Sequence, residues 1–359
     1  MNALPTLICV GLNHNTAPIE IREQAAVSAD KTPSFLESVS RHLQLSEAVL
    51  ISTCNRVEVI AVTSHPHEAI QVWPRYLSLL HGRDFTPHVF HCTGADAVIH
   101  LFELAAGLRS MVIGETEIFG QIKQSYALAT AAGFTQKITH RLFQSAFNAA
   151  KEARARTTIT AGNVSIATVA ADLAEKIFSS LFTCTILLLG AGEISHRTLR
   201  TLHSRGAQKI LVANRTFDRA EAISCDIPQA TPIAWEAWPT WLHRVDIVIA
   251  STSAHHHLIQ AADFPHAPPH PLFLIDLAVP RNIDPAVNSI ENIYLYNIDD
   301  LALIAQNNML QRQAAIAKAK EILLPHAARF IQWLEKNYHP SPLHPTPAKD
   351  WQLSPQFKA

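Results

Sequence analysis

The hydrophobic run Cys184–Leu189, which passes directly into Gly190-Ala191-Gly192, constrains the fold of this chain more than any other stretch. A short run that is apolar throughout is typical of a central parallel strand, because both faces of such a strand are buried. Similar runs follow at 209–213, 246–250 and 272–276, with helical spacing between them. Strands that alternate with helices predict a parallel sheet with helical crossovers. We therefore expect a Rossmann-like α/β domain in the second half of the chain.

The turn after the first of these strands predicts a dinucleotide site. Gly190 permits a tight turn, and Gly192 lets backbone amides approach a pyrophosphate at a helix N-terminus. Ser195 stands where the third glycine of the fingerprint would be, which weakens the motif. The strand before the turn and the helix after it support the interpretation. The predicted cofactor-binding residues are Gly190, Ala191, Gly192, Glu193, Ile194, Ser195, Asn214, Arg215 and Thr216.

The end of the second strand indicates which dinucleotide binds. NAD-binding domains usually place an Asp or Glu there for the ribose 2′-hydroxyl. Here the strand ends in Asn214-Arg215-Thr216, which offers no carboxylate and one guanidinium. Because Arg215 suits a 2′-phosphate, we predict NADPH rather than NADH. The alternative is that Arg215 is an ordinary surface arginine.

In the first half of the chain, Cys54 lies where an apolar run ends at Ser52 and alternation resumes at Val57. This pattern predicts a strand, a tight loop and a second strand. A nearby cation or imidazole lowers the pKa of a thiol and makes it nucleophilic, and Arg56 is one candidate. The alternative is that Cys54 is small apolar filler. A reactive thiol together with a reduced nicotinamide suggests one chemistry, in which a thioester forms on the cysteine and hydride reduces it to an aldehyde.

The first 160 residues predict a separate α+β module. Strands at 6–12, 47–52 and 57–62 are separated by helices and tight loops, which indicates a mostly antiparallel sheet. The stretch 107–121 is a loop rich in glycine and polar residues that caps the following helix, and capping does not exclude a role in ligand binding. The helix at 136–156 carries five basic residues against one acid, which fits either a solvated face or a nucleic-acid contact.

Composition narrows the class of protein. With 359 residues, 48 % of them hydrophobic and 16 % charged, the chain has room for two or three domains and is not globally disordered. A net charge of −1 excludes a generic polyanion binder. Five cysteines without CxxC spacing, and an N-terminus without a basic leader, predict reduced thiols and a cytoplasmic location. No apolar run approaches the ~18 residues of a membrane helix. We interpret His255-His256-His257 as a loop and predict no metal site.

Taken together, these motifs resemble those of the bacterial glutamyl-tRNA reductases. The matching segments, in order from Gly11 to about Asp300, are GLNHNTAPIEIRE, STCNRVEV, HLFELAAGLRSMVIGETEIFGQIK, LGAGE, ANRT and DLAVPRNIDP. The resemblance implies an NADP-dependent oxidoreductase that reduces glutamyl-tRNA(Glu) to glutamate-1-semialdehyde through a cysteine thioester and releases tRNA. This is the first step of tetrapyrrole (porphyrin, 5-aminolevulinate) biosynthesis by the five-carbon route.

The resemblance also implies roles for particular residues. Cys54 would be the nucleophile, and Thr53, Asn55 and Arg56 would line the glutamate pocket with it. His100 matches an activity-linked histidine, although a lone histidine on an apolar helix is otherwise a core residue. The residues that match the family's substrate-contacting loop are Ser110, Glu115, Thr116, Glu117 and Gln121.

The expected organisation is an α/β multidomain chain. We predict a catalytic α+β domain at 1–160 that binds the glutamyl end of tRNA, an NADPH-binding Rossmann domain at 161–297, a long C-terminal helix at 298–338 and a disordered tail at 339–359. The family forms homodimers through a longer C-terminal domain, so dimerisation is left open here. The family also passes its aldehyde to glutamate-1-semialdehyde aminotransferase.

Two other functions remain open at this point. A shikimate-type NADP dehydrogenase also carries Asn-Arg-Thr after its second strand, but it uses a lysine base and no cysteine. A shortened, non-catalytic paralogue that binds NADPH or tRNA would keep the nucleotide motif.

Overall fold

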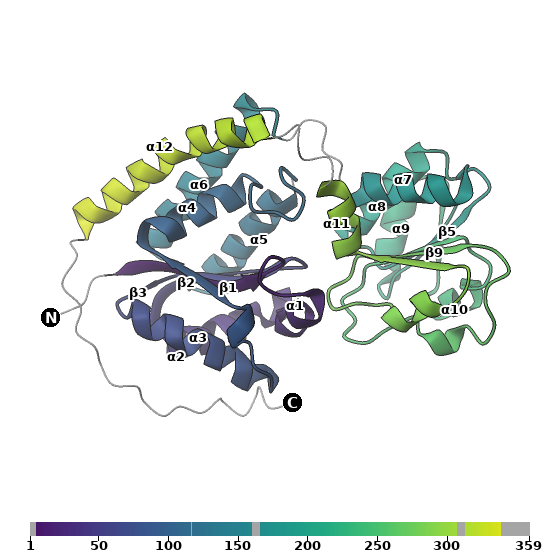
Figure 1. The fold of residues 1–359 in the computed structure, drawn as a ribbon, viewed down its shortest axis with the longest axis horizontal. Helices are drawn as coiled ribbons and strands as arrows, with labels where there is room; N and C mark the ends of the chain where they lie inside the picture. The colour runs from purple at the N-terminus through teal and green to yellow at the C-terminus, as the bar shows by residue number, and fades with distance from the viewer. Residues whose placement is uncertain (1–4, 116, 160–165, 307–312, 339–359) are drawn as a thin grey trace. The chain divides into compact units, whose positions relative to one another are not determined.

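The computed structural model describes residues 5–115, 117–159, 166–306 and 313–338. They divide into two compact units (Figure 1). Unit 1 comprises the described residues up to 159 together with those from 313, and unit 2 comprises 166–306. Among the described residues, no helix is both long enough and apolar enough to cross a membrane.

Unit 1 is built on a four-stranded antiparallel sheet. Its order is β2 (Leu45–Thr53), β3 (Arg56–Thr63), β1 (Thr6–Asn13) and β4 (Phe90–Thr93). All of β3 is buried, because helices cover both faces of the sheet (Figure 1). The predicted α+β module with a mostly antiparallel sheet is therefore confirmed.

Two layers of helices enclose this sheet (Figure 1). One face is covered by α1 (Ile19–Ala25), α2 (Thr32–Leu43) and α3 (Pro66–His81), and the other by α4 (Gly94–Ala105), α5 (Glu117–Ala131) and α6 (Lys137–Arg156). Pro33 and Pro66 lie in the first turns of α2 and α3, where a missing backbone N–H costs nothing.

Unit 2 contains a six-stranded, wholly parallel sheet. Its order is β7 (Ala230–Ile233), β6 (Lys209–Ala213), β5 (Thr185–Leu189), β8 (Ile247–Ala250), β9 (Leu272–Asp276) and β10 (Ile293–Asn297). In chain order this is 3-2-1-4-5-6, the doubly wound arrangement of dinucleotide-binding domains. The Rossmann-like fold is confirmed, and its strand order reverses between β5 and β8, where ligands bind in such sheets.

Helices α7 (Ile166–Phe178), α8 (Glu193–Ser204) and α9 (Phe217–Asp226), with the short α10 (Trp238–Trp241), connect and cover these strands. The α8 helix begins immediately after the glycine turn that follows β5, with Gly192 as its N-cap residue. This places the N-terminus of a helix at the strand-order reversal.

The two halves of the predicted long C-terminal helix belong to different units. Helix α11 (Ile298–Gln306) packs on α7 in unit 2, whereas α12 (Gln313–Asn337) packs on α4 and α6 in unit 1. Residues 307–312, like the predicted tail at 339–359, lie outside the described residues. The apolar period of a helix does not specify the core against which it packs, so the sequence could not separate the two segments.

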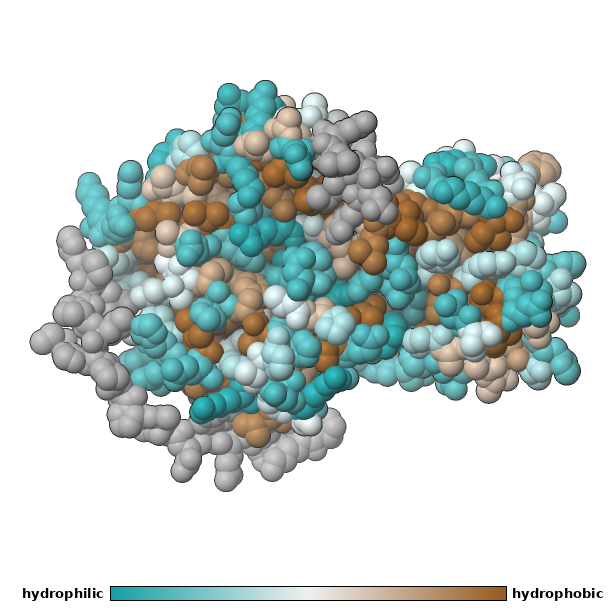
Figure 2. Space-filling view, in the orientation of Figure 1, coloured by the Kyte–Doolittle hydropathy of each residue, from teal (hydrophilic) through white to brown (hydrophobic). Residues whose placement is uncertain are grey.

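Helix α12 completes the core of unit 1. Ala319, Leu323, Ala327 and Phe330 are all at most 3 % exposed and join its hydrophobic cluster. Apolar residues also reach the surface along α12 and α4 (Figure 2), and Leu324 is among them at 52 % exposure. The helix continues through Pro325.

Candidate active site

The β2–β3 hairpin presents Cys54 in a two-residue turn. Thr53 pairs with Arg56 across the hairpin, so only Cys54 and Asn55 lie between the strands. The flanking strands are embedded in the core, and the Cys54 side chain itself is only half-buried. The predicted strand, loop and strand are confirmed, and the thiol sits on a rigid support.

A buried arginine from α1 holds this turn. Arg22 is 1 % exposed, and its Nη1 donates to the Cys54 carbonyl oxygen at 2.7 Å and to Asn55 Oδ1 at 3.2 Å. The backbone N–H of His14 donates to the Asn55 carbonyl oxygen at 2.9 Å. Sequence reasoning missed Arg22, although it lies within the quoted segment GLNHNTAPIEIRE.

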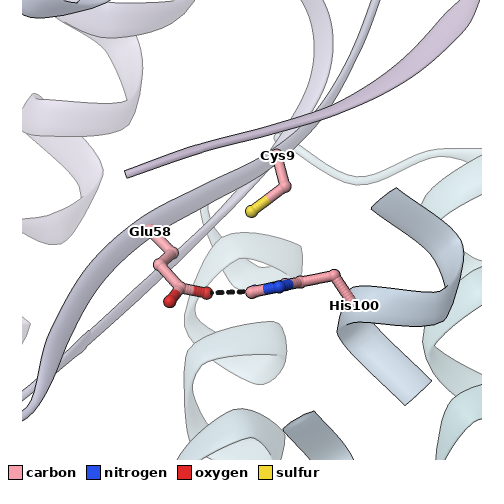
Figure 3. Close-up of side chains that lie close together, drawn as sticks. All are labelled: Cys9, Glu58 and His100. Carbon is pink, nitrogen blue, oxygen red and sulfur yellow. Dashed lines mark hydrogen bonds and ion pairs between the residues drawn. The ribbon is translucent and has the colours of Figure 1, made fainter. Parts of the chain in front are cut away.

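Three buried, charged or ionisable residues form a chain behind the hairpin. Arg56 Nη1 donates to Glu58 Oε1 at 2.7 Å. His100 Nε2 donates to Glu58 Oε2, also at 2.7 Å, and Figure 3 shows this second bond. None of the three is more than 2 % exposed. His100 is therefore paired with a carboxylate that fixes its ring, and Glu58 is a site residue that sequence reasoning did not identify.

The charge of Glu58 follows from these partners. Burial alone would raise the pKa of the carboxyl group, but the charges of Arg56 and His100, with their hydrogen bonds, outweigh burial and lower the pKa to about 2. Glu58 is thus ionised at neutral pH.

Arg56 has an internal role in this arrangement. Besides its bond to Glu58, it donates from Nη2 to the Arg109 carbonyl oxygen, so both terminal nitrogens are engaged within unit 1. Residues two apart on a strand share a face, which directs Arg56 and Glu58 to the same side of β3. The cation that hydrogen-bonds to the Cys54 turn is therefore Arg22, whereas the two terminal nitrogens of Arg56 bond to Glu58 and Arg109.

The predicted substrate loop lies next to this chain of residues. The backbone N–H of Gly114 donates to the Gly107 carbonyl oxygen at 2.9 Å and closes the loop, and both glycines have positive φ. Ser110 is buried within the loop at 5 % exposure. Glu117 and Gln121 lie four residues apart on α5 and so share a face, whereas Thr116 lies outside the described residues.

Glu115 has an unusual proton affinity. Burial, followed by repulsion from Glu117, raises the pKa of Glu115 to about 7, against the opposing effects of Ser110, Arg56 and Arg154. A carboxyl group with this pKa can donate or accept a proton at neutral pH.

Cys9 approaches the same carboxylate from β1. Three atoms that could ligate a metal lie within 4.8 Å of one another, one each from Cys9, Glu58 and His100 (Figure 3). This spacing could hold a metal ion. However, both Glu58 oxygens already accept hydrogen bonds, one of them from a guanidinium. This arrangement suits a positioned histidine better than a metal.

The predicted basic helix, α6, has several of its cations engaged inside unit 1. The Arg141 guanidinium lies 4.4 Å from the ring centroid of Trp333 on α12. Arg154 donates to the carbonyl oxygens of Ala105 and Glu115, both at 3.3 Å. Two of the five basic residues of this helix, Arg141 and Arg154, therefore contribute to packing within unit 1.

In unit 2, the glycine turn forms a cradle for a dinucleotide. Gly190 has φ +95°, and a Cβ there would collide with the Ser251 carbonyl oxygen after β8. A Cβ on Gly192 would lie 2.7 Å from Ser251 Oγ. Ser195 is fully buried, and its hydroxyl donates to the Gly192 carbonyl oxygen at 2.8 Å, so it packs inside the turn. These residues fit the predicted cofactor.

The end of β6 is open to solvent at Arg215. Its guanidinium carbon lies 5.8 Å from the ring centroid of Trp235, which follows β7 and was not identified from the sequence. Asn214 Nδ2 donates to the Thr216 carbonyl oxygen at 2.8 Å and shapes the turn. An exposed cation beside an aromatic ring at this edge suits a phosphorylated adenosine ribose.

The loops after β8 and β9 are tied together. Asp276 is 1 % exposed and accepts from the backbone N–H groups of Ala278, Asn282 and Ile283. Asn282 Oδ1 accepts from the backbone N–H and the hydroxyl of Thr252, at 2.8 and 2.9 Å. Asp276 thus organises the edge of the sheet, and burial raises its pKa to about 7 against these backbone bonds.

A different family model matches each unit. A family described as "Glutamyl-tRNAGlu reductase, N-terminal domain" matches residues 10–157, and one described as "Shikimate / quinate 5-dehydrogenase" matches residues 172–304. The likeness to shikimate dehydrogenases, considered above for the whole chain, thus coincides with the nucleotide-binding unit.

Relatives match across almost the whole chain. Glutamyl-tRNA reductase of Desulfatibacillum aliphaticivorans is 40 % identical over 336 residues, which are 92 % of this chain and 77 % of the relative. That of Akkermansia muciniphila is 38 % identical over 331 residues, 90 % of this chain and 97 % of the relative. The solved glutamyl-tRNA reductase of Methanopyrus kandleri is 32 % identical, with a TM-score of 0.51 over 94 % of this chain and 82 % of that one. The chain belongs to the glutamyl-tRNA reductase family.

Proposed function

We propose that Cys54 is the nucleophile with which this chain carries out the reaction of its family, the NADPH-dependent reduction of glutamyl-tRNA to glutamate-1-semialdehyde. This is the first step of tetrapyrrole biosynthesis. The observation that carries the assignment is the position of Cys54: a half-buried thiol in a two-residue turn between core strands, with a buried guanidinium bonded to its own carbonyl group.

In the first step, the Cys54 thiolate attacks the ester carbonyl carbon of glutamyl-tRNA. A carbon–sulfur bond forms, the carbon–oxygen bond to the terminal ribose breaks, and the tRNA oxygen takes up a proton. Glu115 is suited to supply that proton, because its pKa of about 7 keeps much of it protonated at neutral pH. His100, held by Glu58, would polarise the ester or handle protons nearby.

In the second step, NADPH bound to unit 2 would supply the hydride that reduces the thioester carbonyl, and cleavage of the carbon–sulfur bond would release the aldehyde and regenerate the Cys54 thiolate. Gly190 and Gly192 would admit the pyrophosphate to the turn before α8. Arg215 would bind the 2′-phosphate, with Trp235 beside it. The Asp276–Asn282–Thr252 network would hold the two loops of the nicotinamide side in place.

The finer properties stay predictions from the resemblance. They are selectivity for tRNA(Glu), homodimerisation, delivery of the aldehyde to glutamate-1-semialdehyde aminotransferase and a cytoplasmic location.

The test is NADPH oxidation that depends on glutamyl-tRNA, measured with and without a thiol alkylator. Cys54→Ser should form no aldehyde while still binding NADPH, and Cys225→Ser, at an exposed cysteine of α9, should behave as wild type. A shikimate-type dehydrogenase would be indifferent to alkylation, and a non-catalytic paralogue would bind NADPH without oxidising it. Wild-type turnover in Cys54→Ser would refute the thioester route.

A further inference from the structure

The turn that carries Cys54 accepts a hydrogen bond from a buried guanidinium, that of Arg22. The sequence motifs did not place Arg22 in the site. Arg22 Nη1 bonds to the Cys54 carbonyl oxygen and the Asn55 side chain, and its Nε donates to the Ala17 carbonyl oxygen at 3.2 Å. The side chain is 1 % exposed. The guanidinium bonds to the backbone carbonyl oxygen of Cys54, the same residue that carries the sulfur.

The other guanidinium near the turn is compensated. Arg56 forms a 2.7 Å ion pair with Glu58, and their side chains are 1 % and 0 % exposed. The carboxylate beside Arg56 therefore offsets part of its charge. Arg22 donates to the Ala17 and Cys54 carbonyl oxygens and to Asn55 Oδ1, which places its guanidinium against the turn itself.

The charges of Arg22 and Arg56 also act on His14, which does not itself add a charge. It follows β1, and its backbone donates to the Asn55 carbonyl oxygen. Burial, then the charges of Arg56 and Arg22, lower the pKa of His14 to about 4, so its imidazole is neutral at neutral pH. Charged and titratable groups around the turn thus include Arg22 on α1, His14 after β1, and the Arg56–Glu58 pair on β3.

We propose that Arg22 is the positioning residue of the nucleophile: it fixes the backbone of the Cys54 turn and its charge favours the thiolate. The role of Arg22 rests on the proposed role of Cys54. An opposite charge within ~4–6 Å of an ionisable group favours its charged form by about 1–3 pKa units. Arg22 would therefore increase the fraction of Cys54 present as thiolate at neutral pH.

The test measures the rate of Cys54 alkylation by iodoacetamide against pH, with each labelled cysteine peptide quantified by mass spectrometry. In Arg22→Gln, the midpoint should shift by about one unit to higher pH, and the rate at neutral pH should fall about tenfold. Arg22→Lys keeps the charge but loses the planar fork, so its midpoint should stay near wild type while kcat with glutamyl-tRNA falls. Arg41→Gln, at an exposed pair with Glu37, is the matched control and should change neither quantity.

Circular dichroism establishes that each variant is folded. A wild-type alkylation profile in folded Arg22→Gln would overturn the electrostatic role, and wild-type kcat in Arg22→Lys would overturn the positioning role. If Arg22→Gln does not fold, the lysine variant decides: an upward shift of its midpoint by one unit or more contradicts the proposal, and an unshifted midpoint with reduced kcat supports it. Failure of the proposed function would appear separately, as turnover in Cys54→Ser.

Discussion

Glu58 on β3 and His100 on α4 meet across the interior of unit 1, with 2.7 Å between Oε2 and Nε2 and at most 2 % exposure for either residue. The pair converts a histidine on an apolar helix into an oriented group, and Arg56 balances its carboxylate from the other side. The stability of unit 1 and the geometry of the site therefore depend on the same charges.

Glu58→Gln should destabilise the protein strongly. It leaves Arg56 buried without its counter-charge, and breaking a buried pair costs about 3–5 kcal/mol. Urea denaturation of the variant measures this loss. Glu37→Gln, which breaks an ion pair whose side chains are each 63 % exposed, is the control and should cost less than about 1 kcal/mol. Equal losses in the two variants would contradict the view that Glu58 anchors the site.

Acid should weaken the fold through the same carboxylate. The pKa of Glu58 is about 2 in the folded state, against ~4.3 in an unfolded chain, so its stabilising contribution is present above ~4.3 and is lost as pH falls towards 2. His14, with a pKa of about 4 when folded and ~6.5 when unfolded, adds a loss that begins at higher pH. Unfolding free energies measured across this range should fall less steeply in Glu58→Gln than in wild type, and an unchanged slope would count against this assignment.

The pH profile of turnover should report Glu115. If Glu115 delivers the proton to the departing tRNA oxygen, kcat falls as pH rises through about 7, because the carboxyl group loses that proton. Glu115→Gln should remove this limb of the profile and lower kcat by about 10²–10⁴-fold. Glu117→Gln removes a charge that raises the pKa, so the limb should move to lower pH. If the limb stays at the same pH in both variants, a group other than Glu115 is responsible for it.

Gly190→Ala should abolish NADPH binding without affecting Cys54. The new Cβ would strike the Ser251 carbonyl oxygen at a backbone φ of +95°, and such strain costs about 1–3 kcal/mol before any loss of pyrophosphate contacts. Fluorescence titration with NADPH measures the effect, and alkylation of Cys54 should remain normal. Gly206→Ala is the matched control: φ there is +105°, but apart from the adjacent residues no atom of the described residues lies within 4 Å of the added Cβ. Comparable NADPH affinities in the two variants would contradict the prediction that the Gly190 turn binds the dinucleotide.

Arg215→Ala should discriminate between the two nicotinamide cofactors. Loss of a charge-assisted contact costs about 1.5–3 kcal/mol, so the KM for NADPH should rise about 10- to 100-fold while that for NADH changes little. Arg219→Ala, in the first turn of the following helix, is the control. Equal increases for both cofactors would show that Arg215 does not contact the 2′-phosphate.

Local patterns predicted the parts of the site that depend on neighbours in sequence. The Cys54 hairpin and the Gly190 turn each follow from a strand that ends in a short polar or glycine-rich stretch. Glu58 could not be assigned in this way, because its partner His100 is 42 residues away and nothing in the strand pattern indicates which carboxylate a helix will meet. Arg22 was missed for the same reason, since it acts on a turn 32 residues along the chain. Trp235 belongs to a different strand end from Arg215, and only the parallel sheet brings them together.

Because α12 completes the core of unit 1, that unit is assembled from two distant parts of the chain, with all of unit 2 encoded between them. During synthesis, every strand of the nucleotide-binding sheet is translated before Ala319, Leu323 and Phe330. All the strands of unit 2 are therefore made before the catalytic unit receives α12. A released chain that ends before α12 should accordingly bind dinucleotide through unit 2 but lack a protease-resistant catalytic half.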